Sequence, residues 1–291
     1  MFEGIFTAVV TPFKDGKIDE NALTRLIERQ ISAGISGIVP VGTTGESATL
    51  TYEEHYRVIE IAVSVVNGRI PVIAGVGSNS TAETCCNMQV AKRLGANGAL
   101  VITPYYNKPP QEGLYQHYAI VAQSADLPVI LYNVLGRTGV NIEPVTIARL
   151  ATECPSIVGI KEANGDMKRV SEIIRSCSDD FVILSGDDSS NLPIYALGGR
   201  GAISVASNVA PDHVVRLWHA WRDGDIAQAQ KIHYDLWPLN QILFVETNPI
   251  PVKAALAMMG LTRGDCRLPL SQIGAENRKK IENVLRSMDL L

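Results

Sequence analysis

Lys161 is the residue whose sequence context points most directly to chemistry. It follows Ser156–Ile160, a short run rich in β-branched residues that predicts a strand buried on both faces. Alternation along that strand puts Gly159 and Lys161 on the same face. Because burial disfavours the ammonium form, we expect a neutral amine near neutral pH, which can form a Schiff base with a carbonyl substrate. A strand-end lysine can instead extend to water or pair with a carboxylate.

A Schiff-base enzyme also needs proton-transfer groups, because carbinolamine formation, dehydration and enamine formation each move a proton. Tyr132 ends the apolar run Pro128–Tyr132, one predicted strand before Lys161, and its hydroxyl could serve in such a relay. The alternative is a half-buried tyrosine whose hydroxyl binds water. Arg137 follows five residues later. Its planar guanidinium suits a carboxylate, unless it is a solvated loop residue.

A pair of threonines between glycines forms a third candidate, in the segment Val41-Gly42-Thr43-Thr44-Gly45-Glu46-Ser47. Glycines let the backbone approach a ligand closely, and the amides and hydroxyls of this segment offer donors to a carboxylate. A plain tight turn would explain the same residues. Further candidate residues follow other predicted strands, namely Tyr105, Tyr106, Asn133 and Gly186.

These candidates all follow apolar runs, which recur along the chain as Ile5–Val10, Gly37–Val41, Pro71–Val76, Ala99–Thr103, Pro128–Tyr132, Ile157–Lys161, Phe181–Ser185 and Ala202–Val205. Amphipathic segments separate the runs, and Thr51/Glu54 and Ser80/Glu83 both fit the capping box of a helix start. Strict alternation of strand and helix predicts a parallel (β/α)8 TIM barrel, whose active site lies at the carboxyl ends of the strands. An open doubly wound sheet is the alternative. We expect the barrel to span residues 1–224 and a C-terminal helical extension to span residues 225–291.

Composition limits the function classes. The 291 residues are 46% hydrophobic and carry a net charge of −4, which argues against nucleic-acid binding. No apolar run approaches a membrane span and no targeting segment is recognisable, so we expect a cytoplasmic protein that binds no membrane. The five cysteines and five histidines show no metal-binding spacing, so we expect no metal site.

Taken together, four segments resemble the 4-hydroxy-tetrahydrodipicolinate synthase family, also called dihydrodipicolinate synthases, among the pyruvate-dependent class I aldolases. They are the segment from Val41 to Ser47, Pro104-Tyr105-Tyr106, Tyr132-Asn133-Val134 through Arg137-Thr138-Gly139, and Gly159-Ile160-Lys161-Glu162-Ala163. The resemblance implies a barrel with a helical C-terminal domain, assembled as a homotetramer of two tight dimers. It also implies condensation of pyruvate with L-aspartate 4-semialdehyde, without a cofactor, on the diaminopimelate route to lysine.

The same resemblance implies roles for particular residues. Lys161 would form the Schiff base with pyruvate and Tyr132 would donate and accept protons. Thr43 and Tyr106 would complete the relay, with Tyr106 reaching into the neighbouring subunit's site. The remaining substrate contacts would come from Thr44 and the backbone of Ile203 to the pyruvate carboxylate, from Gly186, and from Arg137 to the semialdehyde carboxylate.

Many members are inhibited by L-lysine at the tight-dimer interface, and the matching positions here are Ser47, Ala48, His55, Asn79, Glu83 and Tyr105. Two positions depart from the pattern. Tyr52 stands where lysine-sensitive relatives carry histidine, and Leu135-Gly136 replaces a frequent Pro-Ser, so we expect a more mobile loop around Arg137.

Two rival functions remain open at this point. Sister aldolases such as N-acetylneuraminate lyase and 2-keto-3-deoxy sugar acid aldolases share Lys161 and Tyr132, whereas Arg137 favours an amino-acid carboxylate. A non-catalytic barrel that senses a metabolite is the rival of a different class, and it has no reason to keep a buried amine.

Overall fold

The computed structural model describes residues 2–291 and divides into two compact units. The first unit contains the residues before Ile5 together with Pro71–Ile203, and the second contains Ile5–Ile70 and Ser204–Leu291. Strands β1 (Gly4–Ala8) and β10 (Gly201–Ser204) each run from one unit into the other.

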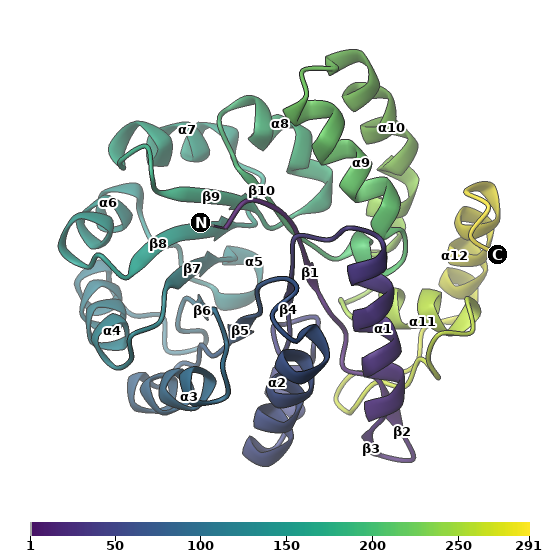
Figure 1. The fold of residues 1–291 in the computed structure, drawn as a ribbon, viewed down its shortest axis with the longest axis horizontal. Coiled ribbons are helices and arrows are strands. Elements are labelled where there is room, and N and C mark those ends of the chain that lie inside the picture. Colours follow the sequence, from purple (N-terminus) through teal and green to yellow (C-terminus); the bar gives the residue numbers. More distant parts are fainter. Residues whose placement is uncertain (1) are drawn as a thin grey trace. The chain divides into compact units, whose positions relative to one another are not determined.

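The first unit is a run of parallel strands with a helix between each strand and the next. Its strands pair in sequence order and are β5 (Ile73–Gly75), β6 (Gly98–Ile102), β7 (Val129–Asn133), β8 (Ile157–Glu162), β9 (Val182–Ser185) and β10. Its helices are α3 (Thr81–Arg93), α4 (Gln111–Gln123), α5 (Leu135–Thr138), α6 (Pro144–Glu153), α7 (Met167–Ser176) and α8 (Asn191–Ala196), with a 3-10 turn at Asp188–Ser190. Figure 1 shows α3, α4, α6 and α7 along the outer side of these strands.

Strand register in the first unit sets which side chains can meet. Tyr132 on β7 lies opposite Lys161 on β8, and Lys161 lies opposite Leu184 on β9. The close approach of β8 to β9 requires a glycine, because a Cβ at Gly159 would lie 2.4 Å from the carbonyl oxygen of Val182. The catalytic candidates of β7 and β8 therefore stand opposite each other on adjacent, paired strands.

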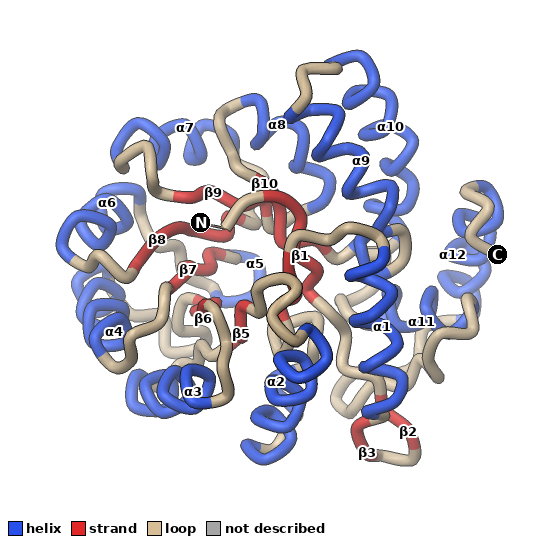
Figure 2. Tube along the Cα trace, viewed as in Figure 1, coloured by secondary structure: helices blue, strands red, loops and turns tan. Residues whose placement is uncertain are grey.

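The second unit contains the parallel pair β1 and β4 (Gly37–Val39) and a hairpin of β2 (Phe13–Lys14) and β3 (Lys17–Ile18). Its helices are α1 (Glu20–Ser32), α2 (Tyr52–Val66), α9 (Pro211–Arg222), α10 (Ile226–Ile242), α11 (Ile250–Met258) and α12 (Ala275–Ser287), with 3-10 turns at Ser47–Thr49 and Ala206–Asn208. Helix α9 packs along α10, and α11 packs on α12 (Figure 2).

All eight apolar runs form strands, in one parallel sheet of order β4-β1-β10-β9-β8-β7-β6-β5. The capping box at Thr51 and Glu54 is confirmed. The capping box predicted at Ser80 and Glu83 is only partly correct. The Ser80 side chain caps the helix, but the Glu83 carboxylate accepts a hydrogen bond from Ser78 Oγ at 2.7 Å. The Ser80 amide instead donates to Ser78 Oγ at 3.2 Å, so it does not reach the Glu83 carboxylate. The division at residues 224 and 225 stays a prediction. Within residues 2–291, no helix has the length and apolar character needed to cross a membrane.

Candidate active site

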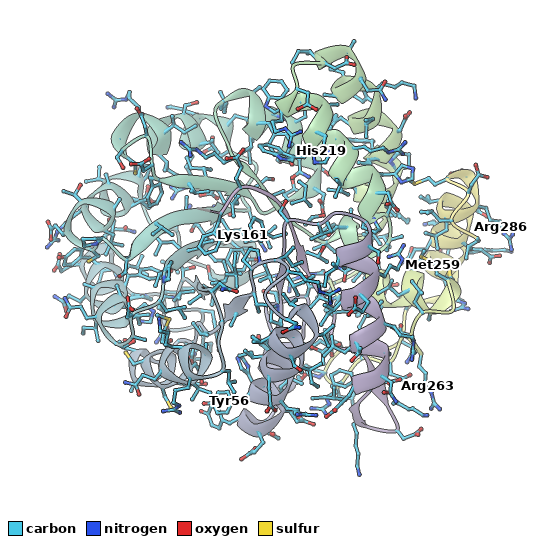
Figure 3. All side chains as sticks on the ribbon, in the orientation of Figure 1. Tyr56, Lys161, His219, Met259, Arg263 and Arg286 are labelled. Carbon is cyan, nitrogen blue, oxygen red and sulfur yellow. The ribbon has the colours of Figure 1, made fainter. Side chains whose placement is uncertain are left out.

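Lys161 is buried in the first unit and reaches over the ring of its strand neighbour. Its side chain is only 5% exposed, and Nζ lies 4.2 Å from the centre of the Tyr132 ring. Figure 3 shows Lys161 among the strands of this unit. Among residues 2–291, Lys161 forms no ion pair with a carboxylate. A buried amine without a counter-ion is available as a nucleophile, and the alternative of a salt-linked strand-end lysine is excluded.

Space for the lysine side chain comes from the end of the next strand. A Cβ at Gly186 would lie 2.9 Å from Lys161 Cε, 3.0 Å from its Cγ and 2.7 Å from the Cβ of Ala163. Gly186 therefore permits the observed path of the Lys161 side chain, which any larger residue would block. Ile203, on β10 in the same unit, is buried.

The residue after Lys161 explains why the lysine has no carboxylate partner. Glu162 is fully buried and accepts hydrogen bonds from Arg169 Nε at 3.0 Å and from Asn133 Nδ2 at 3.0 Å. The amide of Asn164 donates to its other oxygen at 3.2 Å. Alternation along β8 turns Glu162 away from Lys161, and these donors satisfy its charge there.

Arg137 lies on one turn of helix rather than in a loop. The amide of Leu135 starts α5 by donating to Asn164 Oδ1 at 2.8 Å, and Gly139 ends it in the left-handed region at φ 72°. Because Asn164 also donates to Asn141 Oδ1 at 2.9 Å, α5 is tied to the polar network around Glu162. Sequence reasoning missed Asn164, although an asparagine is a frequent partner for a free helix-start amide. Arg137 itself is exposed.

Two tyrosines follow β6 with different environments. Tyr105 is half-buried, whereas Tyr106 is 88% exposed and has a left-handed backbone with φ 72°. An exposed aromatic ring on a left-handed, non-glycine residue is unusual. Asn107 Nδ2 donates to the Asn79 carbonyl at 2.9 Å, which ties this segment to the one after β5.

The two threonines lie in the second unit, in a turn after β4. Thr44 is buried and its Oγ1 accepts a hydrogen bond from Asn248 Nδ2 at 3.0 Å. The turn closes through the amide of Gly45, which donates to the Gly42 carbonyl at 3.0 Å, and that of Glu46, which donates to the Thr43 carbonyl at 3.1 Å. Thr43 is half-buried.

Beside this turn lies a buried ion pair that sequence reasoning missed. Lys253 Nζ donates to Glu46, and the two side chains are 0% and 1% exposed. Burial lowers the pKa of Lys253, and the Glu46 carboxylate opposes that shift. The only sequence signal was a lysine within the apolar segment of α11, Ile250–Met258. Lys161 and Lys253 are both buried, but only Lys253 has a carboxylate partner.

The six candidate effector residues divide between the units. Asn79, Glu83 and Tyr105 belong to the first unit, where Glu83 accepts from Ser78 as described. Ser47 and Ala48 belong to the second unit, at the 3-10 turn after Glu46, and so does His55, which is buried on α2.

Parallel βα units with an unpaired, buried lysine define a class of protein, the barrel enzymes that use an amine nucleophile. The dihydrodipicolinate synthetase family model matches residues 1–288, and the chain belongs to that family. It is 60% identical to 4-hydroxy-tetrahydrodipicolinate synthase of Thermodesulfovibrio yellowstonii, with all of both chains covered. Membership of this family shows that the protein is an enzyme of the lyase class.

Solved structures are similar over the whole chain. Dihydrodipicolinate synthase from Acinetobacter baumannii, complexed with pyruvate, matches with a TM-score of 0.97 and 45% identity, covering all of both chains. The structure of dihydrodipicolinate synthase from Cyanidioschyzon merolae with lysine bound matches with a TM-score of 0.97 and 42% identity. The match covers 100% of this chain and 99% of the other. Together with the strand order, this confirms the predicted (β/α)8 barrel with its C-terminal helices.

Proposed function

We propose that the protein is a 4-hydroxy-tetrahydrodipicolinate synthase that joins pyruvate to L-aspartate 4-semialdehyde through a Schiff base on Lys161. The observation that carries the proposal is the buried Lys161 amine, which has no carboxylate partner among residues 2–291 and lies 4.2 Å from the Tyr132 ring centre. The relatives and the family model support this reaction over the sister aldolases and over a non-catalytic sensor.

The chemistry begins when Lys161 Nζ adds to the ketone carbon of pyruvate. Loss of water gives an imine, and loss of a methyl proton gives an enamine, whose carbon attacks the aldehyde of the semialdehyde. The aldehyde oxygen takes up a proton and becomes a hydroxyl group. The amine of the semialdehyde then adds to the imine carbon, Lys161 leaves as a free amine and the ring closes. The iminium itself accepts the electrons, so the proposal includes no cofactor.

Roles for the surrounding groups follow from their chemistry and from family membership. We infer that Tyr132 moves the protons at the imine, with Thr43 and Tyr106 completing the relay. Thr44 and the backbone of Ile203 would hold the pyruvate carboxylate, beside Gly186. Arg137 would bind the semialdehyde carboxylate, because its guanidinium matches a carboxylate with two parallel hydrogen bonds.

We also propose assembly as a homotetramer of two tight dimers. The support within this chain is Tyr106, which is 88% exposed and has a left-handed backbone, an unusual combination for an aromatic residue. Inhibition by L-lysine is a further proposal, supported by the lysine-bound relative and by Glu83, whose carboxylate could take an effector's ammonium group. The cytoplasmic location expected from the composition stays a prediction.

The function is tested by reduction with borohydride in the presence of pyruvate, followed by peptide mass analysis. We expect a stable adduct on Lys161 in the wild type and none in Lys161→Met. A coupled assay with both substrates should show condensation, and added L-lysine should lower its rate. An intact, folded protein that forms no adduct would falsify the mechanism.

Arg137→Ala separates the synthase from the sister aldolases. Losing the paired contact to the semialdehyde carboxylate should raise KM for the semialdehyde roughly tenfold or more, while KM for pyruvate changes little. Equal changes in the two constants would count against the assigned second substrate.

A further inference from the structure

The turn that carries Thr43 and Thr44 is held in a strained backbone conformation. Val41 and Glu46, at its two ends, both have left-handed φ angles of 50° and 55°. A left-handed backbone is unfavourable for a β-branched residue such as Val41 and persists only where surrounding structure enforces it. Within the turn, a Cβ at Gly45 would lie 2.9 Å from the Val41 amide nitrogen, so the two ends are pressed together.

Glu46 is a residue of this turn that other parts of the second unit contact by hydrogen bonds. One carboxylate oxygen accepts from Lys253 Nζ, and the other accepts from the Arg267 amide at 2.9 Å. Lys253 Nζ also lies 4.2 Å from the centre of the Phe13 ring. All of these partners belong to the second unit.

A third contact acts on the turn from the same C-terminal region. Asn248, two residues before α11, donates to Thr44 Oγ1 at 3.0 Å. Residues 248, 253 and 267 therefore hold Thr44 and Glu46 from outside the turn. Replacing a buried ion pair by apolar residues is often neutral or stabilising, so stability alone is a weak reason for this pair.

We propose that Lys253 and Glu46 are positioning residues that preorganise the turn for the carboxylate of pyruvate. This inference rests on the proposed function, in which Thr44 binds that carboxylate. The pair keeps the turn strained before substrate arrives, so that the hydroxyl and amide donors need no rearrangement on binding. Neither residue contacts the reacting atoms in this scheme; both act through the turn.

The test uses Glu46→Gln, which keeps the shape but removes the charge, and Lys253→Met, which removes the amine. For both variants we expect KM for pyruvate to rise roughly tenfold, since a small misplacement of binding groups is sufficient for such a loss. KM for the semialdehyde should change less than about twofold, because Arg137 is untouched. At saturating pyruvate, borohydride should still label Lys161 fully.

The control is Arg263→Ala, at a residue labelled in Figure 3. It breaks the exposed ion pair with Asp15, also in the second unit, and should leave both constants unchanged. Should either single variant fail to fold, Glu46→Gln/Lys253→Met leaves no lone buried charge, and Asn248→Ala removes the hydrogen bond to Thr44 Oγ1. For these variants too, we expect KM for pyruvate to rise and KM for the semialdehyde to change little.

Two results would overturn the inference: an unchanged KM for pyruvate in the folded variants, or an equal rise in both constants, as a merely structural role would produce. The proposed function fails separately, when the wild type itself forms no adduct with pyruvate.

Discussion

Two buried lysines in this chain differ in one respect that decides their chemistry. Lys253 is paired with Glu46, so its amine is committed to an ion pair. Lys161 lies over an aromatic ring, and the neighbouring carboxylate of Glu162 is occupied by Arg169 and Asn133. Burial alone therefore does not mark a nucleophile; burial without a counter-ion does.

Gly186→Ala tests how closely the Lys161 side chain is positioned. A methyl group there would lie 2.9 Å from Lys161 Cε and 2.7 Å from the Ala163 Cβ, so the lysine must move. We expect kcat to fall roughly tenfold to a hundredfold, because displacement of a reacting atom by about 1 Å has that effect. Steady-state kinetics measures it.

Gly136→Ala is the matched control. A Cβ at Gly136 would meet nothing within 4 Å, and Gly136 lies in helix α5, where alanine is accepted. Its kcat should match the wild type. If Gly186→Ala retains full kcat as well, the lysine has more freedom than its surroundings indicate.

At the scale of elements, buried polar contacts join neighbouring helices. His117 on α4 is 5% exposed and its Nδ1 lies 2.9 Å from Thr81 Oγ1 at the start of α3. Burial lowers the pKa of His117 to about 4. The imidazole is therefore neutral in the folded protein at pH values where an unfolded chain already binds a proton.

This difference predicts that acid weakens the fold through His117. An exposed histidine has a pKa of about 6.5, so below that value the unfolded state takes up a proton that folded His117 refuses. The stability that depends on neutral His117 is fully present above about pH 6.5, and it is lost as the pH falls towards about 4. Between about pH 7 and about pH 5, the wild type should lose about 2 kcal/mol more than His117→Gln.

Urea unfolding at the two pH values measures this difference, and the variant corrects for all other titrating groups. Parallel losses in wild type and variant would show that His117 does not take part. Thr81→Ser, which keeps the hydroxyl, should behave as the wild type.

At the scale of the whole molecule, Tyr106 is the residue on which the proposed assembly can be tested. Tyr106 is 88% exposed and has a left-handed backbone. In the proposed tight dimer it would reach the neighbour's site. Closed two-fold symmetry would then place each subunit's ring in the other's site.

Mixing two impaired variants tests this exchange. Lys161→Ala lacks the nucleophile and Tyr106→Phe lacks the relay hydroxyl, so each should be weak or inactive alone. In a mixed dimer, one site combines an intact Lys161 with an intact Tyr106, and random exchange of subunits should restore about a quarter of wild-type activity.

Coupled assays after co-refolding or subunit exchange measure the recovery. A mixture no more active than the mean of its parents would mean that Tyr106 acts within its own subunit, or not at all. Lys161→Ala mixed with the wild type should keep half of wild-type activity whether or not subunits exchange, so it corrects for protein lost during refolding.

Local patterns were sufficient for much of the fold. The β-branched runs predicted all eight parallel strands, and Thr51 with Glu54 predicted the start of α2. The hairpin β2–β3 was missed because strands of two residues carry no alternation. Glu83 was assigned the wrong partner because the Ser78 hydroxyl, five residues earlier, competes for its carboxylate.

The sequence by itself determined the elements and the residue types of the site, since strand and helix periodicity and the order of polar residues are local properties. Only the tertiary structure decided which buried lysine is unpaired, that Asn164 anchors the helix of Arg137, and that Lys253 reaches Glu46. Those contacts join residues separated by up to 207 positions. Pairing across such separations depends on how the strands and helices pack, which no local pattern encodes.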